Sequence, residues 1–352
     1  MASIPDLRGS EETLEQLLSI PYPETVEMMK RLEGDLLILG VGGKIGPSLA
    51  ATAANACAKA GVQKRIIGVD KVLTAEVTER LTRLGVETQL CDLSEYEQVN
   101  DLPRVRNVIF MAGRKFGQVG SEPLTWLMNA VIPGNVGQAF RGSRIVVFST
   151  GCVYELVSTD GIGSLETDRP KPVGEYANSC LGRERVFEYY CSTFKTPVLL
   201  FRLNYAVDLR YGVIVEIAKQ VYDGKPVDIT VNAANVIWQG DAVNRALLCL
   251  EHTSCPAAIL NITGRQTLRV DAVAQQFGQI FRKTPSFCGS NSGKAYLSNA
   301  DRSFRLFGLP RVTETQMIQM VAEWMKTGGA ILDKPTHFNV TDGQFLDGGG
   351  KA

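Results

Sequence analysis

The first residues along the chain with a clear chemical use are glycines at three-residue spacing. Gly40, Gly43 and Gly46 stand in the stretch GVGGKIG, directly after the apolar run DLLILG. Backbone amides at a helix N-terminus hold phosphate groups, and glycines there leave room for the phosphate to approach. The loop therefore predicts a pyrophosphate site for a dinucleotide, although a tight structural turn would have the same composition. The residues expected to line this site are Gly40, Gly42, Gly43, Lys44, Ile45 and Gly46.

An acidic residue follows where dinucleotide-binding folds recognise a ribose. The apolar run RIIGVD ends in Asp70, and a carboxylate about 20 residues beyond such a glycine loop accepts hydrogen bonds from the adenosine ribose. Because a carboxylate repels a 2′-phosphate, Asp70 favours NAD over NADP, while the adjacent Lys71 weakens that preference. In the next run, TQLCDL, Asp92 is expected to reach the adenine beside Leu93, or else to cap a helix.

Six short apolar runs organise the first part of the chain. They are rich in Ile, Val, Leu or Phe and apolar on both faces, as strands of a helix-covered parallel sheet must be. Helix-length segments such as 46–60 and 176–192 separate them. This alternation predicts an α/β fold with a doubly wound, Rossmann-like parallel sheet. The runs are residues 35–40, 65–70, 88–93, 107–113, 144–150 and 197–204.

The pattern divides the chain into four regions. Residues 1–34, with leucines at helical spacing, are expected to form a helical extension. Residues 35–205 are expected to form the NAD-binding Rossmann domain. In 206–330 the alternation loosens, which predicts a smaller substrate-binding lobe with strands that return to the sheet. Residues 331–352 end in DGGGKA and form a tail, either partly mobile or wrapped onto a neighbour.

Composition narrows the class of partner. Lys plus Arg and Asp plus Glu each total 37, so no net charge draws nucleic acid or an anionic membrane. No apolar stretch reaches the ~18 residues of a membrane span, and no signal peptide is evident, which predicts a soluble, cytoplasmic protein with a small-molecule partner. The eight cysteines lack a C-x-x-C pair and suit reduced core thiols. With only His252 and His337, neither a metal site nor a Ser-His-Asp hydrolase is expected.

Taken in order, the motifs resemble the extended short-chain dehydrogenase/reductase family, in particular its NAD-dependent epimerase/dehydratase type, which includes the UDP-galactose 4-epimerases. The resemblance runs from about residue 35 to about residue 326. Beyond the glycine loop it rests on FMAG (110–113), NAVIPGN, VVFSTGCVY, YANSCLGRE and RLN (202–204). It implies a Rossmann fold, NAD as cofactor, a sugar-type substrate and a homodimer. The apolar stripe Phe187, Tyr190, Cys191 and Phe194 would suit a dimer seam or burial within one chain.

The resemblance also implies roles for individual residues. In the family a tyrosine hydroxyl gives or takes the proton of the reacting hydroxyl, and a second hydroxyl polarises the substrate oxygen. These positions fall on Tyr176 and Thr150. Cofactor contacts are implied for Met111, Ala112, Gly113 and Asn129. Substrate contacts are implied for Lys115, Thr150, Gly151, Cys152 and Asn204.

The chain departs from the family where the catalytic lysine should stand. That lysine follows the tyrosine by four residues, holds the nicotinamide ribose and lowers the tyrosine pKa. Here the position is Cys180. Residues i and i+4 share a helix face, so a neutral thiol replaces an ammonium beside Tyr176. Arg183, Lys44 and Lys115 are the candidates to supply the charge, and Cys180 is either a packing residue or a nucleophile.

A second departure concerns the substrate. Nucleotide-sugar epimerases bind the substrate diphosphate with an arginine, and counting back from Asp241 puts Ala234 at that position. Loss of a charge-assisted contact commonly worth ~1.5–3 kcal/mol favours a substrate that is not nucleotide-linked. Arg210 is a candidate for binding a carboxylate or sugar hydroxyls, unless it is a surface charge. Trp238 is expected to stack on a sugar, unless it lies in the core.

Two functions from different classes follow. The first is an NAD-dependent oxidoreductase or epimerase acting on a hydroxyl of a sugar or sugar acid, with Tyr176 as acid/base. The second is a non-catalytic NAD-binding sensor or partner protein that has lost the catalytic lysine. A dehydratase is the least supported, because such enzymes place a glutamate beside the catalytic hydroxyl and this chain has Gly151 and Cys152 there.

Overall fold

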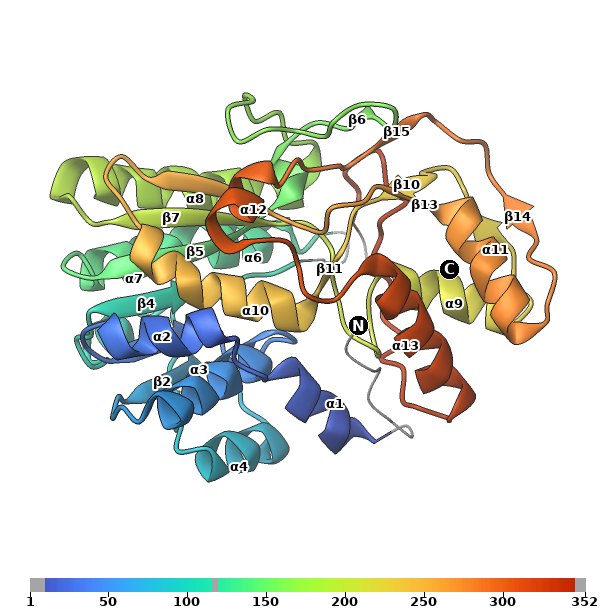
Figure 1. Ribbon diagram of the computed structural model, residues 1–352. Coiled ribbons are helices and arrows are strands. Elements are labelled where there is room, and N and C mark those ends of the chain that lie inside the picture. The colour runs from blue at the N-terminus through green and yellow to red at the C-terminus, as the bar shows by residue number, and fades with distance from the viewer. Residues whose placement is uncertain (1–9, 116–119, 346–352) are drawn as a thin grey trace.

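A seven-stranded parallel sheet forms the centre of the molecule (Figure 1). The computed structural model describes residues 10–115 and 120–345. The strand order β12-β7-β5-β4-β1-β2-β3 reverses direction at β1, as in doubly wound folds. The predicted fold class is therefore confirmed, and each predicted run supplies one strand. The strands are β1 (Leu36–Leu39), β2 (Ile66–Asp70), β3 (Glu87–Leu90), β4 (Asn107–Phe110), β5 (Arg144–Thr150), β7 (Val198–Leu203) and β12 (Ala258–Ile262).

Strand side chains alternate between two separate cores. Leu36 and Ile38 of β1 pack into the first core, while Leu37 and Leu39 pack into the second. All four are buried, which explains why the run is apolar without alternation. The first core is covered by α2 (Pro23–Arg31), α3 (Gly46–Ala60), α4 (Ala75–Arg83) and α10 (Gln239–Leu248). The second is covered by α5 (Tyr96–Asn100), α7 (Ile132–Ala139) and α8 (Gly174–Phe194) (Figure 1).

A smaller lobe lies beyond the carboxyl ends of the strands, on the right in Figure 1. Its core is formed by α9 (Val213–Tyr222), α11 (Val270–Phe281) and α13 (Glu314–Lys326), and α1 (Glu11–Leu18) packs onto it through Leu14 and Leu18. Short two-stranded pairs complete the lobe and join it to the main sheet domain. They are β6 (Val157–Ser158) with β15 (Lys294–Ala295), β8 (Ala206–Val207) with β11 (Ile237–Trp238), β9 (Val227–Asp228) with β14 (Phe287–Cys288), and β10 (Ala233–Ala234) with β13 (Leu268–Arg269).

The remaining elements are short. A π-turn, η1 (Leu127–Val131), follows α6 (Glu122–Trp126) and leads into α7. The 3₁₀ turn η2 (Gly151–Val153) directly follows β5, and η3 (Cys249–His252) extends α10. Helix α12 (Asp301–Phe307) packs near β12.

A buried ion pair joins α8 to the sheet. Glu184 accepts hydrogen bonds from Arg202 Nη2 at 2.6 Å and Nε at 2.9 Å, and the two side chains are 0% and 1% exposed. Ser149 donates to the same carboxylate at 2.6 Å, and Arg202 donates to the Tyr154 hydroxyl at 2.7 Å. Tyr154 in turn donates to Asn261 of β12 at 2.9 Å. The network fixes α8, β5, β7, η2 and β12 relative to one another.

The apolar stripe on α8 is used within the chain. Phe187 and Cys191 are buried in the second core, and Phe187 packs on Phe110 at 5.3 Å between ring centroids. Tyr190 donates a hydrogen bond to the carbonyl of Gly134 at 3.0 Å. Of the two interpretations of this stripe, burial within one chain is the one that these contacts bear out. The homodimer itself stays a prediction.

The C-terminal segment packs onto its own chain up to Phe345. Phe338 joins the core of the smaller lobe, and Phe345 joins a cluster with Tyr176 and Tyr296. Residues 1–9 and 346–352, including all of DGGGKA, lie outside the described residues. Within the described part of the chain, no helix combines the length and apolar character needed to cross a membrane.

Removing one partner of the buried ion pair is expected to destabilise the fold strongly. Arg202→Met should lower the free energy of unfolding by about 3–5 kcal/mol, because Glu184 would be left buried without its counter-charge. The decrease is measured as a lower urea midpoint in circular dichroism.

A matched surface variant serves as the control. Arg65 pairs with Glu87 at 2.8 Å with both side chains about half exposed, and exposed ion pairs contribute little. Arg65→Met should therefore leave the midpoint unchanged. An Arg202→Met protein as stable as the parent would contradict the role assigned to the pair.

Candidate active site

The glycine loop between β1 and α3 has the form of a phosphate cradle. A Cβ at Gly40 (φ +94°) would lie 2.5 Å from the amide nitrogen of Ala112, and one at Gly46 would collide with the carbonyl of Val41. Both glycines are therefore needed for the loop to close on β4 and α3. At Gly43, by contrast, a Cβ would meet only the Gly40 oxygen, at 3.5 Å. Gly43 lines the main cavity and leaves space for a ligand group. The loop thus fits the pyrophosphate of a dinucleotide.

Asp70 ties the end of β2 to this loop. Its carboxylate accepts hydrogen bonds from the amides of Gly42 at 2.8 Å and Lys71 at 2.7 Å. Two amides leave lone pairs on both oxygens for further donors such as ribose hydroxyls. Lys71 does not neutralise Asp70, because its ammonium pairs with Asp92 at 2.6 Å. Because the Lys71 ammonium is paired with Asp92, it no longer argues against the preference of Asp70 for NAD over NADP.

Asp92 is engaged by its own neighbourhood. The side chain of Ser94 donates to it at 2.6 Å and the Ser94 amide at 3.0 Å. The hydrogen bond from Lys71, followed by those from Ser94, lowers the pKa of Asp92 to about 2. Asp92 does not cap α5, whose N-cap is Glu95, because its contacts with Ser94 stay within the preceding turn. Its contact with the adenine stays a prediction. Leu93 is buried in the second core, so its side chain does not face a ligand site.

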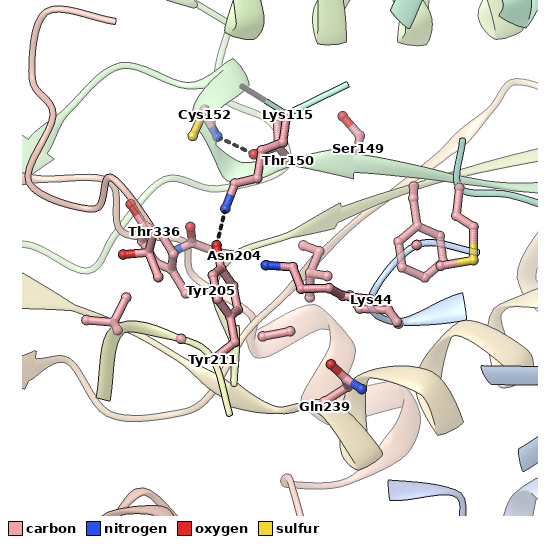
Figure 2. A pocket seen from close by; sticks show the side chains of 18 of the residues that line it. Lys44, Lys115, Ser149, Thr150, Cys152, Asn204, Tyr205, Tyr211, Gln239 and Thr336 are labelled. Carbon is pink, nitrogen blue, oxygen red and sulfur yellow. Dashed lines mark hydrogen bonds between the residues drawn. The ribbon is translucent and has the colours of Figure 1, made fainter. Parts of the chain in front are cut away.

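A cavity of about 260 Å³ extends from the glycine loop to the carboxyl ends of β5 and β7 (Figure 2). It brings together residues predicted from five separate motifs. The predicted residues that line it are Gly40, Gly43, Lys44, Ile45, Met111, Lys115, Thr150, Cys152, Tyr176 and Asn204. The sheet fold collects them because loops at the carboxyl ends of parallel strands share one edge.

Thr150 and Tyr176 form a hydroxyl pair on the wall of this cavity. The Cys152 amide donates to Thr150 Oγ1 at 3.1 Å, so the threonine proton is directed elsewhere. Burial raises the pKa of Tyr176 well above its usual value, while its hydrogen bond with Thr150 and the charge of Arg183 act in the opposite direction. Phe345 packs edge-on against the Tyr176 ring at 5.5 Å between centroids. The pair has the arrangement of a proton-transfer site.

Cys180 lies behind Tyr176 and does not reach the cavity. Its thiol is 1% exposed and packs with Val153 and Tyr154. Burial raises its pKa to about 11, with the charge of Arg183 opposing the shift. A nucleophilic cysteine needs a lowered pKa. These contacts fit the packing interpretation and give no support to a nucleophilic thiol. The assignment of Cys180 to the catalytic unit beside Tyr176 stays a prediction.

Arg183 is the cation nearest in sequence to the missing lysine. Its guanidinium donates to the Phe148 carbonyl at 2.7 Å and to Asn129 Oδ1 at 2.6 Å, and the side chain is 6% exposed. It lies against Gly113, where any Cβ would collide with it. Because these donors are used within the protein, Arg183 is not placed to hydrogen-bond a ligand. It acts on Tyr176 through its positive charge.

Lys44 and Lys115 point into the cavity from opposite sides and converge on Tyr211 (Figure 2). Lys44 Nζ lies 2.7 Å from the centroid of the Tyr211 ring, and Lys115 Nζ donates to the Tyr211 hydroxyl at 3.3 Å. Burial, followed by repulsion from Lys115, lowers the pKa of Lys44 to about 7. Burial also lowers the pKa of Lys115. An anionic group bound between the two amines would favour their protonated forms, so the site suits an anion.

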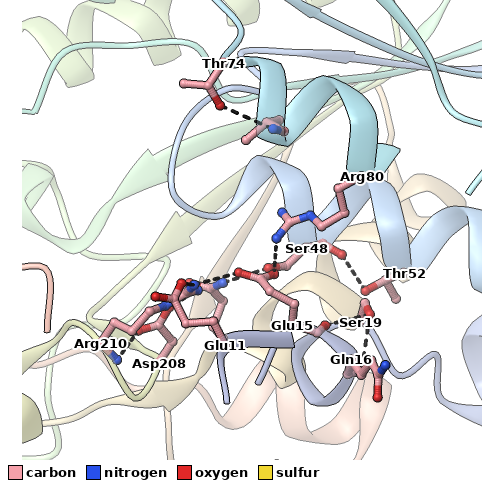
Figure 3. A network of polar contacts seen from close by, with 12 residues as sticks. Glu11, Glu15, Gln16, Ser19, Ser48, Thr52, Thr74, Arg80, Asp208 and Arg210 are labelled. Atoms are coloured by element: carbon pink, nitrogen blue, oxygen red, sulfur yellow. Dashed lines mark hydrogen bonds and ion pairs between the residues drawn. The ribbon is translucent and has the colours of Figure 1, made fainter. Parts of the chain in front are cut away.

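Arg210 is not a substrate residue. Its guanidinium pairs with Glu15 at 2.8 Å and Asp208 at 2.9 Å, with Glu11 3.4 Å away (Figure 3). Glu15 also pairs with Arg80 of α4 at 2.9 Å. The prediction for Arg210 was wrong because these carboxylates neutralise its charge. The ion pairs anchor α1 to the loop that carries Tyr211.

Three further predicted contacts are internal. Trp238 is 1% exposed and packs in the core of the smaller lobe, so it does not stack on a sugar. Asn129 is fully buried and holds Arg114, Ser179 and Arg183 rather than a cofactor. Asn204 borders the cavity but donates both amide hydrogens within the protein, to Asn235 and to the Tyr296 carbonyl. Ala112 and Gly151 are packing residues, because the backbone or side chains of neighbouring segments lie directly against each of them.

Several cavity residues escaped the sequence analysis. Tyr205, Tyr211, Gly212 and Val213 come from the loop after β7, and Thr336 and Phe345 come from the C-terminal segment. Tyr205 carries a strained φ of +46°. The loop was identifiable, since it follows the carboxyl end of a parallel strand. Nothing in the sequence of the tail indicated its place over the cavity. Among the described residues, no cluster of His, Cys, Asp and Glu is arranged to hold a metal ion.

Comparison with known families identifies the same architecture. Residues 36–254 match the family model described as the NAD dependent epimerase/dehydratase family. A search of curated protein sequences finds no match.

Solved structures of epimerases share the fold at low sequence identity. UDP-glucose 4-epimerase from Thermus thermophilus, in complex with NAD, is 19% identical with a TM-score of 0.67, covering 84% of this chain and 99% of that one. UDP-glucuronic acid 4-epimerase from Bacillus cereus, in complex with NAD, is 16% identical with a TM-score of 0.67, covering 83% and 98%. An epimerase from Methanothermobacter thermautotrophicus is 18% identical with a TM-score of 0.69, covering 87% and 96%.

Filling the open position of the glycine loop is expected to weaken dinucleotide binding without unfolding the protein. Gly43→Ala adds a methyl group that the protein accommodates but a pyrophosphate would meet. We expect the Kd for NAD in calorimetry to rise about tenfold or more, equivalent to ~1.4 kcal/mol.

Gly134→Ala is the matched control, because a Cβ at this α7 glycine meets nothing within 4 Å. It should leave the Kd unchanged. Equal NAD affinity in Gly43→Ala, with an unchanged thermal midpoint, would show that the phosphates lie elsewhere.

Proposed function

The chain belongs to the NAD dependent epimerase/dehydratase family, and from that premise we propose that it oxidises a hydroxyl group of a free sugar or sugar acid. The enzyme acts either as a net dehydrogenase or as an epimerase that returns the hydride. The observation that carries the proposal is the Thr150–Tyr176 hydroxyl pair on the wall of a cavity that starts at the glycine loop. Residues 35–205 hold the cofactor, and residues 206–330 together with the tail enclose the substrate.

NAD, the family's cofactor, supplies the hydride acceptor when bound. The glycine loop holds its phosphates, and Asp70 orients its adenosine ribose. Tyr176, as phenolate, takes the proton of the reacting hydroxyl. Thr150, whose oxygen accepts from the Cys152 amide, would donate a hydrogen bond to the substrate oxygen and keep its proton. Carbonyl reduction uses the same groups in reverse, with Tyr176 as the acid.

Without a lysine beside Tyr176, proton abstraction by its phenolate requires a higher pH. Burial raises the phenol pKa of Tyr176, and the influences that oppose it are the hydrogen bond with Thr150 and the buried charge of Arg183. Phenolate is therefore scarcer at neutral pH than in a site with an ammonium next to the tyrosine. Oxidation by Tyr176 is favoured at alkaline pH, and reduction, which needs the neutral phenol, is not penalised.

The shape and charge of the cavity favour a small anionic substrate. Ala234, at the position of the family's diphosphate-binding arginine, is buried in β10 opposite Leu268. Phe345 and Thr336 border the cavity on the side of the smaller lobe. Lys44 and Lys115 offer a carboxylate two ammonium groups within the same space. A free sugar acid satisfies these features better than a nucleotide-linked sugar.

The raised pKa of Tyr176 also favours a second candidate, an NAD-binding protein without catalysis. In that case NAD binds with normal affinity and no substrate turns over. The same assays decide between the two.

Turnover of free sugar acids is the expected outcome of a substrate screen. Uronic and aldonic acids, neutral sugars and UDP-sugars are each incubated with NAD, and NADH absorbance and product stereochemistry by NMR are followed. We expect kcat/KM to be highest for the acids, because the two lysines bind the carboxylate. Tyr176→Phe should lower kcat by about 100-fold or more while leaving the Kd for NAD unchanged. Turnover of UDP-sugars alone would overturn the substrate assignment, and no turnover at all would favour the non-catalytic function.

Restoring a cation beside Tyr176 should shift the pH profile. In the parent protein, the oxidation rate is expected to rise with pH beyond the usual phenol pKa of about 10, because burial raises the pKa of Tyr176. Cys180→Lys should move this limb to lower pH, since an ammonium stabilises the phenolate. Cys180→Met, uncharged and similarly long, is the control and should leave the limb in place. Identical profiles in all three proteins would exclude Tyr176 as the base.

A further inference from the structure

Two cysteines far apart in the sequence meet at the end of α8. The Sγ atoms of Cys191 and Cys255 lie 2.6 Å apart. Cys191 belongs to the last turns of α8 and is 1% exposed, whereas Cys255 lies between η3 and β12 and is exposed. Sequence analysis treated all eight cysteines as isolated core thiols, because the pair shares no local motif. We propose that Cys191 and Cys255 form a disulfide modification site.

The backbone holds both cysteines in position. Val198 and Ser254 form a β-bridge, with N–H···O distances of 3.0 and 3.2 Å in the two directions. Cys255 Sγ lies 3.2 Å from the Cys191 carbonyl and 3.1 Å from the Thr196 carbonyl. The two sulfurs are thus held close together, 2.6 Å apart against a bonded distance of about 2.05 Å.

The exposure of the two thiols sets the order of the chemistry. Burial, followed by its contact with Cys255, raises the pKa of Cys191 to about 12. Cys255, the more exposed residue of the pair, is therefore the one whose thiol meets an oxidant first. The oxidant is a small disulfide of the glutathione class. The Cys255 thiolate attacks it, forming a mixed disulfide and releasing one glutathione thiolate.

Cys191 then resolves the mixed disulfide. Its proton passes to solvent, its sulfur attacks Cys255 Sγ, and the second glutathione leaves as thiolate. Overall, two protein thiols and one oxidised glutathione give one protein disulfide and two reduced glutathiones. The bond ties the C-terminal end of α8, the helix that carries Tyr176, to the segment before edge strand β12.

The test uses the full chain in glutathione buffers of graded oxidation. After acid quench and alkylation, peptide mass spectrometry should show Cys191 and Cys255 joined, with the other buried cysteines alkylated. The folded, oxidised protein should melt at a temperature higher by about 5 °C or more than the reduced protein, because the bond closes a long loop. Recovery of both cysteines alkylated at every glutathione ratio would overturn the proposal.

Three variants keep the result independent of folding defects. Cys255→Ser, at the exposed position, should abolish both the cross-link and the shift in melting temperature. Cys288→Ser, which removes the other exposed thiol, should retain both. In Cys191→Ser, glutathione should remain attached to Cys255, because the resolving thiol is absent. A cross-link that persists in Cys255→Ser, or that forms only after denaturation, would contradict the assignment.

Discussion

Glu184 and Arg202 are buried together where the segments that carry the proposed catalytic residues meet. Thr150 directly follows Ser149, which donates to the Glu184 carboxylate. Tyr176 lies two turns before Glu184 on α8, and Asn204 follows Arg202 by two residues. A buried ion pair costs desolvation energy on both sides, so it contributes less to stability than to geometry. Its directional hydrogen bonds fix the rotation of α8 about the helix axis. In this rotation Tyr176 faces the cavity rather than the core.

The fold was predictable because its signals are local. Six of the seven strands of the parallel sheet overlap the six predicted runs, and the glycine loop and Asp70 lie at ends of such runs. The residues whose predicted roles were wrong are those whose contact partners are distant in sequence. Arg210 meets Glu15 across the whole Rossmann domain, and Trp238 shares a core with residues of α1 and α13, so nothing near either residue signalled its role. Arg202 was the missed clue, since a charge inside an apolar strand requires a buried partner.

Replacement of the family lysine by Cys180 is accommodated rather than compensated. The thiol fits into a small apolar pocket with Val153 and Tyr154, and the nearby positive charge, Arg183, is already committed to Phe148 and Asn129. The two lysines of the site, Lys44 and Lys115, face the ligand space instead of the helix. The positive charge of these two lysines therefore lies where it can act on a ligand in the cavity.

Residues 208–216, the loop before α9 and the first turn of that helix, are held by segments near both termini. Glu11 and Glu15 of α1 bind Arg210, and Thr336 of the tail donates to Glu216, so Tyr211 between them is positioned by segments outside the sheet domain. Those segments contribute nothing to the two cores that flank the sheet. Sequence drift in the terminal segments can therefore reshape the ligand cavity while the catalytic frame stays intact. Evolution of a new substrate preference in this lineage would need few changes, all of them far from the motifs by which such proteins are recognised.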